Sequence, residues 1–131
     1  MPAPPSLRAF LDGEPDWAAI PNMRMIAATL LTARRTMSDR EQAAEADHYD
    51  EQARTLETGH EYEYKLWNRD HWIAYDVVEP TLENATTARW ISDALRDPQL
   101  AARLLALVPE DDLRTVRDQV EATTPERRPP S

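Results

Sequence analysis

Glycine is almost absent from this chain of 131 residues, which contains only Gly13 and Gly59. Tight hairpin turns depend on residues that tolerate positive φ, most often glycine. Loops that cradle phosphates need several glycines so that backbone N–H groups can approach the anion. The sequence therefore offers neither a P-loop nor a dinucleotide-binding fingerprint. Nineteen alanines add to the helical bias, and we expect an all-α fold, a single bundle of about five to six helices.

Proline marks both ends of the expected domain. Residues 1–5 and 123–131 are rich in proline, so we expect disordered tails there and one helical domain over 6–122. The chain contains no cysteine, which rules out a disulfide framework and favours a reducing compartment. The N-terminus lacks the pattern of a signal peptide. No apolar run approaches the roughly 20 residues that span a bilayer. We expect a cytoplasmic protein without membrane contact.

Capping signals divide the first half of the domain. A short helical turn is expected over 6–11, and Asn22 is a candidate N-cap for a helix that ends near Met37. Ser38 and Glu41 have the spacing of a capping box, so a second helix should begin there. Its apolar stripe is narrow, and we expect it to pack against the preceding helix as an antiparallel hairpin. The stripe consists of Ala46, Tyr49, Ala53 and Leu56.

Three helices are expected in the last third of the chain. The first covers roughly 86–96, and Asp97 followed by Pro98 starts the second. Pro109 starts the third, whose first turn carries three acids at the positive end of the helix dipole. Residues 84–122 hold seven acids against five arginines. Direct binding of nucleic acid through these helices is therefore not expected, because a helix that enters a groove must bring cations to phosphates.

Residues 61–79 fit two structures. As a helix, the segment places Tyr62, Leu66, Ile73 and Val77 on one face. As a β-hairpin, residues 61–67 alternate cleanly, 68–70 supply a turn and 72–78 form the second strand. We favour the helix, because two isolated strands need a sheet partner and none is evident. An α+β fold with a hairpin over 61–79 is the alternative.

Negative charge is concentrated in the middle of the chain. Residues 38–83 carry 13 of the 24 acids and four basic residues, a local net charge of −9, and six of the nine aromatic residues. Acids interleaved with large rings are typical of a contact surface. We therefore expect a small acidic protein that binds another protein with a basic surface, as an accessory subunit, regulator or inhibitor. Such acids could also mimic nucleic-acid charge. The candidate partner-binding residues are Glu41, Glu45, Asp47, Asp50, Glu51, Glu57, Glu61, Glu63 and Trp72.

A metal-binding helical bundle is the alternative function. Two Glu-x-x-His patterns supply carboxylate and imidazole one helical turn apart, as in di-iron bundles. Both pairs lie close together in the sequence, however, whereas the metal needs them to face each other from different helices. We therefore expect no metal, no cofactor and no enzymatic activity, and no nucleophile stands in a catalytic motif. The alternative ligands are Glu45, His48, Glu57 and His60. A homodimer could bring the two pairs together, and it would also cover the alanine-lined stripe.

Overall fold

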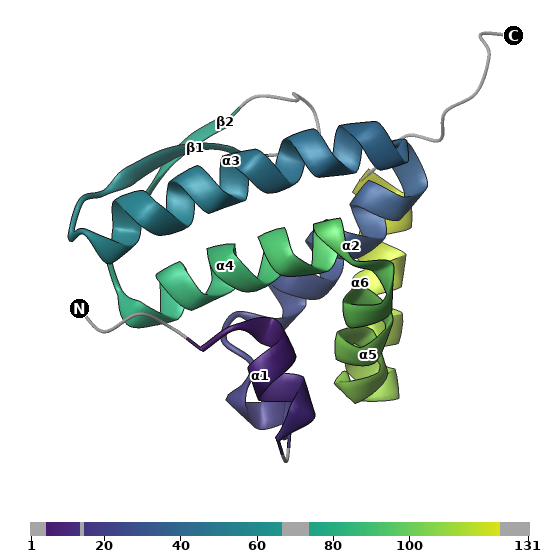
Figure 1. Cartoon of the computed structure of the whole chain (residues 1–131). Coiled ribbons are helices and arrows are strands. Elements are labelled where there is room, and N and C mark those ends of the chain that lie inside the picture. Colours follow the sequence, from purple (N-terminus) through teal and green to yellow (C-terminus); the bar gives the residue numbers. More distant parts are fainter. Residues whose placement is uncertain (1–4, 14, 67–73, 124–131) are drawn as a thin grey trace, which may run out of the picture.

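The computed structural model describes residues 5–13, 15–66 and 74–123. Within these ranges the chain forms six α-helices, one 3₁₀ helix and one β-hairpin (Figure 1). The small helical domain predicted from the sequence is confirmed. In chain order the elements are α1 (Leu7–Asp12), η1 (Trp17–Ala19), α2 (Met23–Thr36), α3 (Asp39–Glu57), β1 (Tyr62–Leu66), β2 (Ala74–Val78), α4 (Leu82–Arg96), α5 (Pro98–Leu107) and α6 (Glu110–Thr123).

The helix boundaries follow the capping signals. The Ser38 hydroxyl accepts the N–H of Glu41 at 3.2 Å, and the Glu41 carboxylate accepts the N–H of Ser38 at 3.1 Å. This capping box starts α3 as predicted. Asp97 caps α5 in the predicted way, with Pro98 in its first turn. Helix α4 begins four residues earlier than expected, because the Thr81 hydroxyl caps it by accepting the N–H of Asn84.

Asn22 precedes α2, as predicted, but its side chain does not cap that helix. Its backbone is left-handed, with φ 50° and ψ 43°, a conformation that asparagine tolerates better than most residues. The side-chain amide instead donates to the Thr87 hydroxyl at 2.8 Å. Asn22 therefore ties the start of α2 to the side of α4.

Helix α3 packs along α4, and the predicted antiparallel pairing of α3 with α2 is wrong. Figure 1 shows α3 and α4 side by side and running in opposite directions. Ala46 and Ala53 of α3 and Ala85 and Ala88 of α4 are all buried. Small side chains on both helices let the two backbones approach closely. Helix α2 packs instead against α6 and α4.

The hydrophobic core joins all six α-helices of the described residues, and α3 contributes Ala46, Tyr49 and Ala53 to it. Each of the other five helices buries at least one large apolar side chain completely, and each such side chain stabilises the fold by about 1.5–3 kcal/mol relative to exposure. These residues are Leu7, Ile26, Ile91, Leu104 and Val116.

The first described residue is held against α4. The Trp90 indole N–H donates to the carbonyl of Pro5 at 2.8 Å. The Trp90 ring also stacks on Phe10 of α1, with 4.6 Å between ring centroids. Of the tail expected over 1–5, Pro5 is therefore anchored, and residues 1–4 lie outside the described ranges. Of the expected second tail, Thr123 closes α6 and residues 124–131 also lie outside them.

Residues 62–66 and 74–78 form an antiparallel β-hairpin, so the favoured helix over 61–79 is wrong and the alternative is confirmed. The strands pair Tyr62 with Val78 and Glu63 with Val77. Strand β1 packs against α3, and in Figure 1 the hairpin lies along α3 on the side away from α4. Helix α3 therefore covers the hairpin, so the two strands need no third strand beside them. The proposed turn over 68–70 and Trp72 lie outside the described residues.

Candidate functional site

Asp50 lies at the centre of a charged network between α3 and α4. Its carboxylate accepts the Ser92 hydroxyl at 2.6 Å, an Arg96 N–H at 2.7 Å and an Arg89 N–H at 3.2 Å. The Asp50 side chain is 20% exposed, which leaves these interactions only partly screened by water. Asp50 therefore forms hydrogen bonds from α3 to three successive turns of α4.

Two further acids of α3 extend this network. Glu57 accepts from Arg89 at 3.0 Å, and Asp47 pairs with Arg96. Asp47, Asp50 and Glu57 were all predicted to contact a partner. Each is instead neutralised by an arginine of the same chain, so their carboxylates stabilise the fold.

Opposing effects set the pKa of Asp50. Burial alone would raise the pKa, since it disfavours the charged form. The hydrogen bonds from Ser92 and Arg96 and the positive charges of Arg96 and Arg89 outweigh burial, so the pKa lies below its ordinary value of 3.8. The carboxylate thus stays ionised, as its two arginine partners require.

Arg89, Ser92 and Arg96 were missed by the sequence analysis. A signal for them exists: Arg89 and Arg96 are seven residues apart, and so are Asp50 and Glu57. Seven residues are two helical turns, which place both members of each pair on one face. Two such faces of opposite charge predict that the two helices pack together, although the segments that carry them lie far apart in the sequence.

Tyr62 of the hairpin lies near two further acids of α3, Glu45 and Glu51. Burial raises the pKa of its phenol, and the carboxylates of Glu51 and Glu45 raise it further. These carboxylates can raise the pKa only if they lie near the ring, because the interaction between charges falls with distance. Acid and aromatic side chains from two separate elements are therefore neighbours in space, as the sequence pattern suggested.

The hairpin turns acidic and apolar side chains outward. Glu61 and Glu63 are exposed, and Val77, which pairs with Glu63 across the strands, is 54% exposed. Side chains of directly paired residues lie on the same face of a hairpin. Tyr62, one residue before Glu63 in β1, lies on the opposite face of the hairpin, toward Glu45 and Glu51 of α3. We call the outward-facing Glu61, Glu63 and Val77, together with Glu45, Glu51 and Tyr62 at the junction with α3, the acidic hairpin surface.

The charges of this surface have no ion-pair partner among the described side chains. Among the side chains of residues 5–13, 15–63 and 77–123, apart from the uncertain positions, no ion pair involves Glu45, Glu51, Glu61 or Glu63. Glu41, the remaining predicted acid, is already engaged in its capping box. The predicted acids therefore divide into a group with partners inside the chain, of which Asp47 remains 74% exposed, and a group without an ion pair, of which Glu51, Glu61 and Glu63 are exposed and Glu45 is half-buried.

The alternative metal ligands are not brought together. Glu45 and His48 lie one turn apart on α3, whereas Glu57 is bound to Arg89 and the His60 ring contacts the Thr58 hydroxyl at 3.2 Å. In the part of the chain that the structure describes, no three His, Asp or Glu side chains form a cluster able to hold a metal ion.

Comparison with known proteins adds no family to this picture, since no family model, curated protein or solved structure matches the chain. None of the helices in the described residues has both the length and the apolar character needed to cross a bilayer. The function must therefore be argued from the arrangement of the side chains.

Proposed function

We propose that this protein binds another protein with a basic surface, as an accessory subunit, regulator or inhibitor, through the acidic hairpin surface. The observation that supports it most directly is that Glu61, Glu63 and Val77 are exposed on the hairpin, which packs against α3. The pKa of Tyr62, which burial, Glu51 and Glu45 raise, agrees with a tyrosine beside two carboxylates where α3 and the hairpin join. Tyrosine is enriched in protein interfaces, where its ring packs and its hydroxyl finds a hydrogen-bond partner.

The distribution of ion pairs also supports this role. The acids of α3 that face α4 meet Arg89 and Arg96, while Glu61 and Glu63 on the hairpin are exposed and have no such partner among the side chains described within 5–63 and 77–123. Neighbouring unpaired carboxylates repel each other, and cations from a partner would relieve that repulsion. Val77 offers an apolar contact beside them.

Mimicry of nucleic-acid charge is the narrower version of this proposal. It was expected to use a continuous series of carboxylates along α3, but Asp47, Asp50 and Glu57 are already ion-paired. Mimicry would depend on the acidic hairpin surface alone. The general version, in which the partner is any protein with a basic patch, needs fewer carboxylates and is the one we favour.

A capture experiment tests the proposal. Immobilised wild-type protein is incubated with a lysate of the native host, and retained proteins are quantified by mass spectrometry. The matched variants are Glu61→Lys/Glu63→Lys on the hairpin and Asp111→Lys/Asp118→Lys on α6, which change the net charge equally at exposed positions. We expect a specific protein to be retained by the wild type and the α6 variant and lost with the hairpin variant.

The opposite pattern would contradict the proposal, as would equal loss with both variants, because either result would assign the binding to another surface or to net charge alone. The purified partner then separates the two versions. Competition by duplex DNA, together with an affinity that falls steeply with salt, would support mimicry. An affinity that barely changes with salt would leave only the general version.

Two further expectations belong to this proposal. The absence of cysteine fits a reducing compartment, and we place the binding in the cytoplasm. A homodimer is also proposed, but the alanine stripe of α3 no longer supports it, because α4 covers that stripe within a single chain. The hairpin is the remaining surface proposed for a dimer, and light scattering of the wild type and the hairpin variant would test it.

A further inference from the structure

Most of the described arginines form ion pairs within the chain. At least six of them do so, with acids that lie mostly on other elements. Four have neither an ion pair nor another charged partner in the described chain: Arg34, Arg40, Arg54 and Arg117. Two of these four, Arg34 and Arg117, line the same pocket. In a chain of net charge −9, two uncompensated guanidinium groups in one pocket need an explanation.

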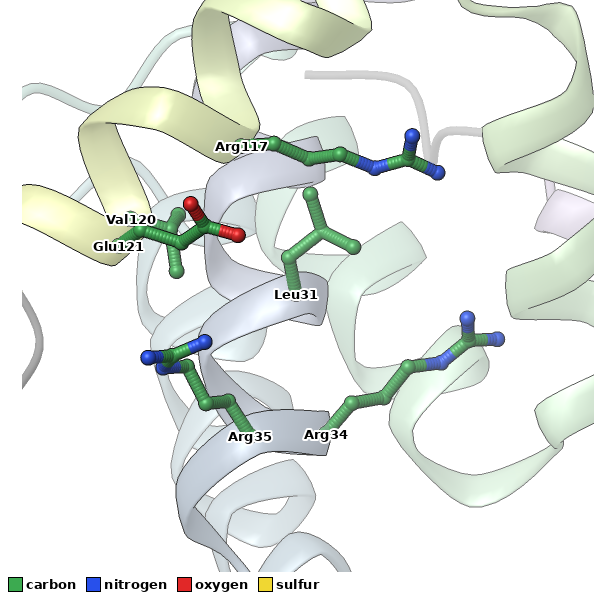
Figure 2. Close-up of a pocket in the computed structure, with 6 residues that line it drawn as sticks. All are labelled: Leu31, Arg34, Arg35, Arg117, Val120 and Glu121. Carbon is green, nitrogen blue, oxygen red and sulfur yellow. The ribbon is translucent and has the colours of Figure 1, made fainter. Parts of the chain in front are cut away.

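The pocket lies where the last turns of α2 meet α6, and its volume is about 260 Å³. Leu31 and Val120 give it an apolar floor, and Arg35 and Glu121 complete the lining. Figure 2 shows Arg34 and Arg117 extending past Leu31 on the same side, while Arg35 and Glu121 lie on the other side of it. The charges are thus separated across the floor.

This arrangement matches a ligand with one anionic head group and one apolar group. Guanidinium presents a planar set of donors that fits the oxygens of a carboxylate or a phosphate. The volume lies just below the roughly 300–1,000 Å³ of complete small-molecule sites, so it suits one side-chain-sized group. Leu31 and Val120 would contact its apolar part.

We propose that the α2–α6 pocket binds an amphipathic oxyanion, held by Arg34 and Arg117 through its head group and by Leu31 and Val120 through its apolar part. The head group is a carboxylate or a phosphate, the two anions that guanidinium recognises in the same way. The pocket involves none of the residues of the acidic hairpin surface, so it is a second and independent site.

Titration followed by NMR tests this site. The probes are phenyl phosphate, phenylacetate and inorganic phosphate at constant ionic strength, and the signals are the Nε–H groups of Arg34 and Arg117. We expect saturable shifts with at least one of the phenyl anions. Its affinity should exceed that of inorganic phosphate by about tenfold, because the ring buries apolar surface against Leu31 and Val120. The tighter of the two phenyl anions identifies the preferred head group.

Matched variants assign the binding to the pocket. The Arg34→Gln/Arg117→Gln variant should bind the preferred phenyl anion at least about tenfold more weakly, since charge-assisted hydrogen bonds are lost. Arg40→Gln/Arg54→Gln removes the two other uncompensated arginines and should change the affinity by less than about twofold, because distant surface charges are screened. All four positions are exposed, so both variants should fold, and circular dichroism would verify it.

Three results would overturn the proposal. The first is the absence of saturable shifts with either phenyl anion up to about 10 mM, a concentration far above that needed for specific binding. The second is equal weakening in both variants, which would mean attraction to net charge. The third is an affinity for inorganic phosphate equal to that for both phenyl anions, which would show that Leu31 and Val120 do not contribute to binding.

Discussion

Asp50 makes more hydrogen bonds to α4 than either Asp47 or Glu57 does. It accepts hydrogen bonds from Ser92, Arg89 and Arg96, whereas its neighbour Glu51 is exposed and has no ion pair in the described chain. Adjacent acids of one helix therefore have different roles. A count of acids along the sequence could not separate them, because the distinction depends on which face meets α4.

Replacement of Asp50 by Asn should destabilise the fold by about 1–3 kcal/mol, since hydrogen bonds to a charged group weaken and both the half-buried Arg89 and the exposed Arg96 lose a counter-charge. The free energy of unfolding in urea at neutral pH measures the effect. Glu51→Gln is the control, and its effect should stay within about 0.5 kcal/mol, as for most surface changes. A D50N variant as stable as E51Q would show that the network contributes nothing.

The lowered pKa of Asp50 predicts how this contribution depends on pH. The folded pKa lies below the ordinary value of 3.8, so the folded state binds the proton less readily than the unfolded chain does. The contribution of Asp50 is therefore fully present above the unfolded pKa and is lost as pH falls through the folded pKa.

This dependence is tested by urea unfolding of the wild type and of D50N at a series of pH values from neutral to acidic. The stability difference between them should be constant near neutrality and should narrow below about pH 4. A difference that widens on acidification would mean that the carboxyl is protonated more easily in the folded protein, contrary to the geometry around Ser92 and Arg96.

At the scale of elements, local signals predicted the helices well. The Ser38 capping box and Asp97 with Pro98 have the predicted roles, and the stripe over 46–56 is buried as predicted, although against α4, because caps and apolar spacing act within one or two turns. The pairing of α3 with α4 was missed, since it depends on contacts between residues about 30–50 positions apart, such as Glu57 with Arg89.

The hairpin likewise combines local signals, which the sequence shows, with a distant contact, which it does not. Alternation from Tyr62 onward favoured strands, and the helix was preferred only because two strands alone are marginal in water. The covering surface comes from α3, an element that the local sequence of the hairpin does not reveal. Of the candidate site, the sequence identified the acids and Tyr62's segment. It did not show which carboxylates α4 would neutralise.

Tyr62 offers a direct test of hairpin docking on α3. Glu45→Gln/Glu51→Gln should lower the pKa of its phenol toward the ordinary value of 10.0, because both carboxylates raise it in the wild type. Burial, the largest cause, remains in the variant, so the pKa should stay above that value. NMR of ¹³C-labelled tyrosine measures the titration. Asp118→Asn on α6 is the control and should leave the pKa unchanged. An unchanged pKa in the E45Q/E51Q variant would place the hairpin away from this side of α3.

At the scale of the whole molecule, charge is unevenly distributed between two ends. The acidic hairpin surface lies beside α3, while the uncompensated arginines Arg34 and Arg117 lie at the α2–α6 pocket. Between them, α4 carries the arginines that neutralise the inner face of α3. This arrangement gives the molecule two surfaces of opposite sign, to which we have assigned a basic partner and an anionic ligand as separate proposals.

Amide hydrogen exchange of the protein, alone and bound to its captured partner, tests the central claim most directly. We predict that the partner slows exchange in β1, β2 and the adjoining part of α3 around Glu45 and Glu51, and leaves α5 and α6 unchanged. Protection confined to α5 and α6, with the hairpin exchanging as in the free protein, would contradict the assignment of the binding surface.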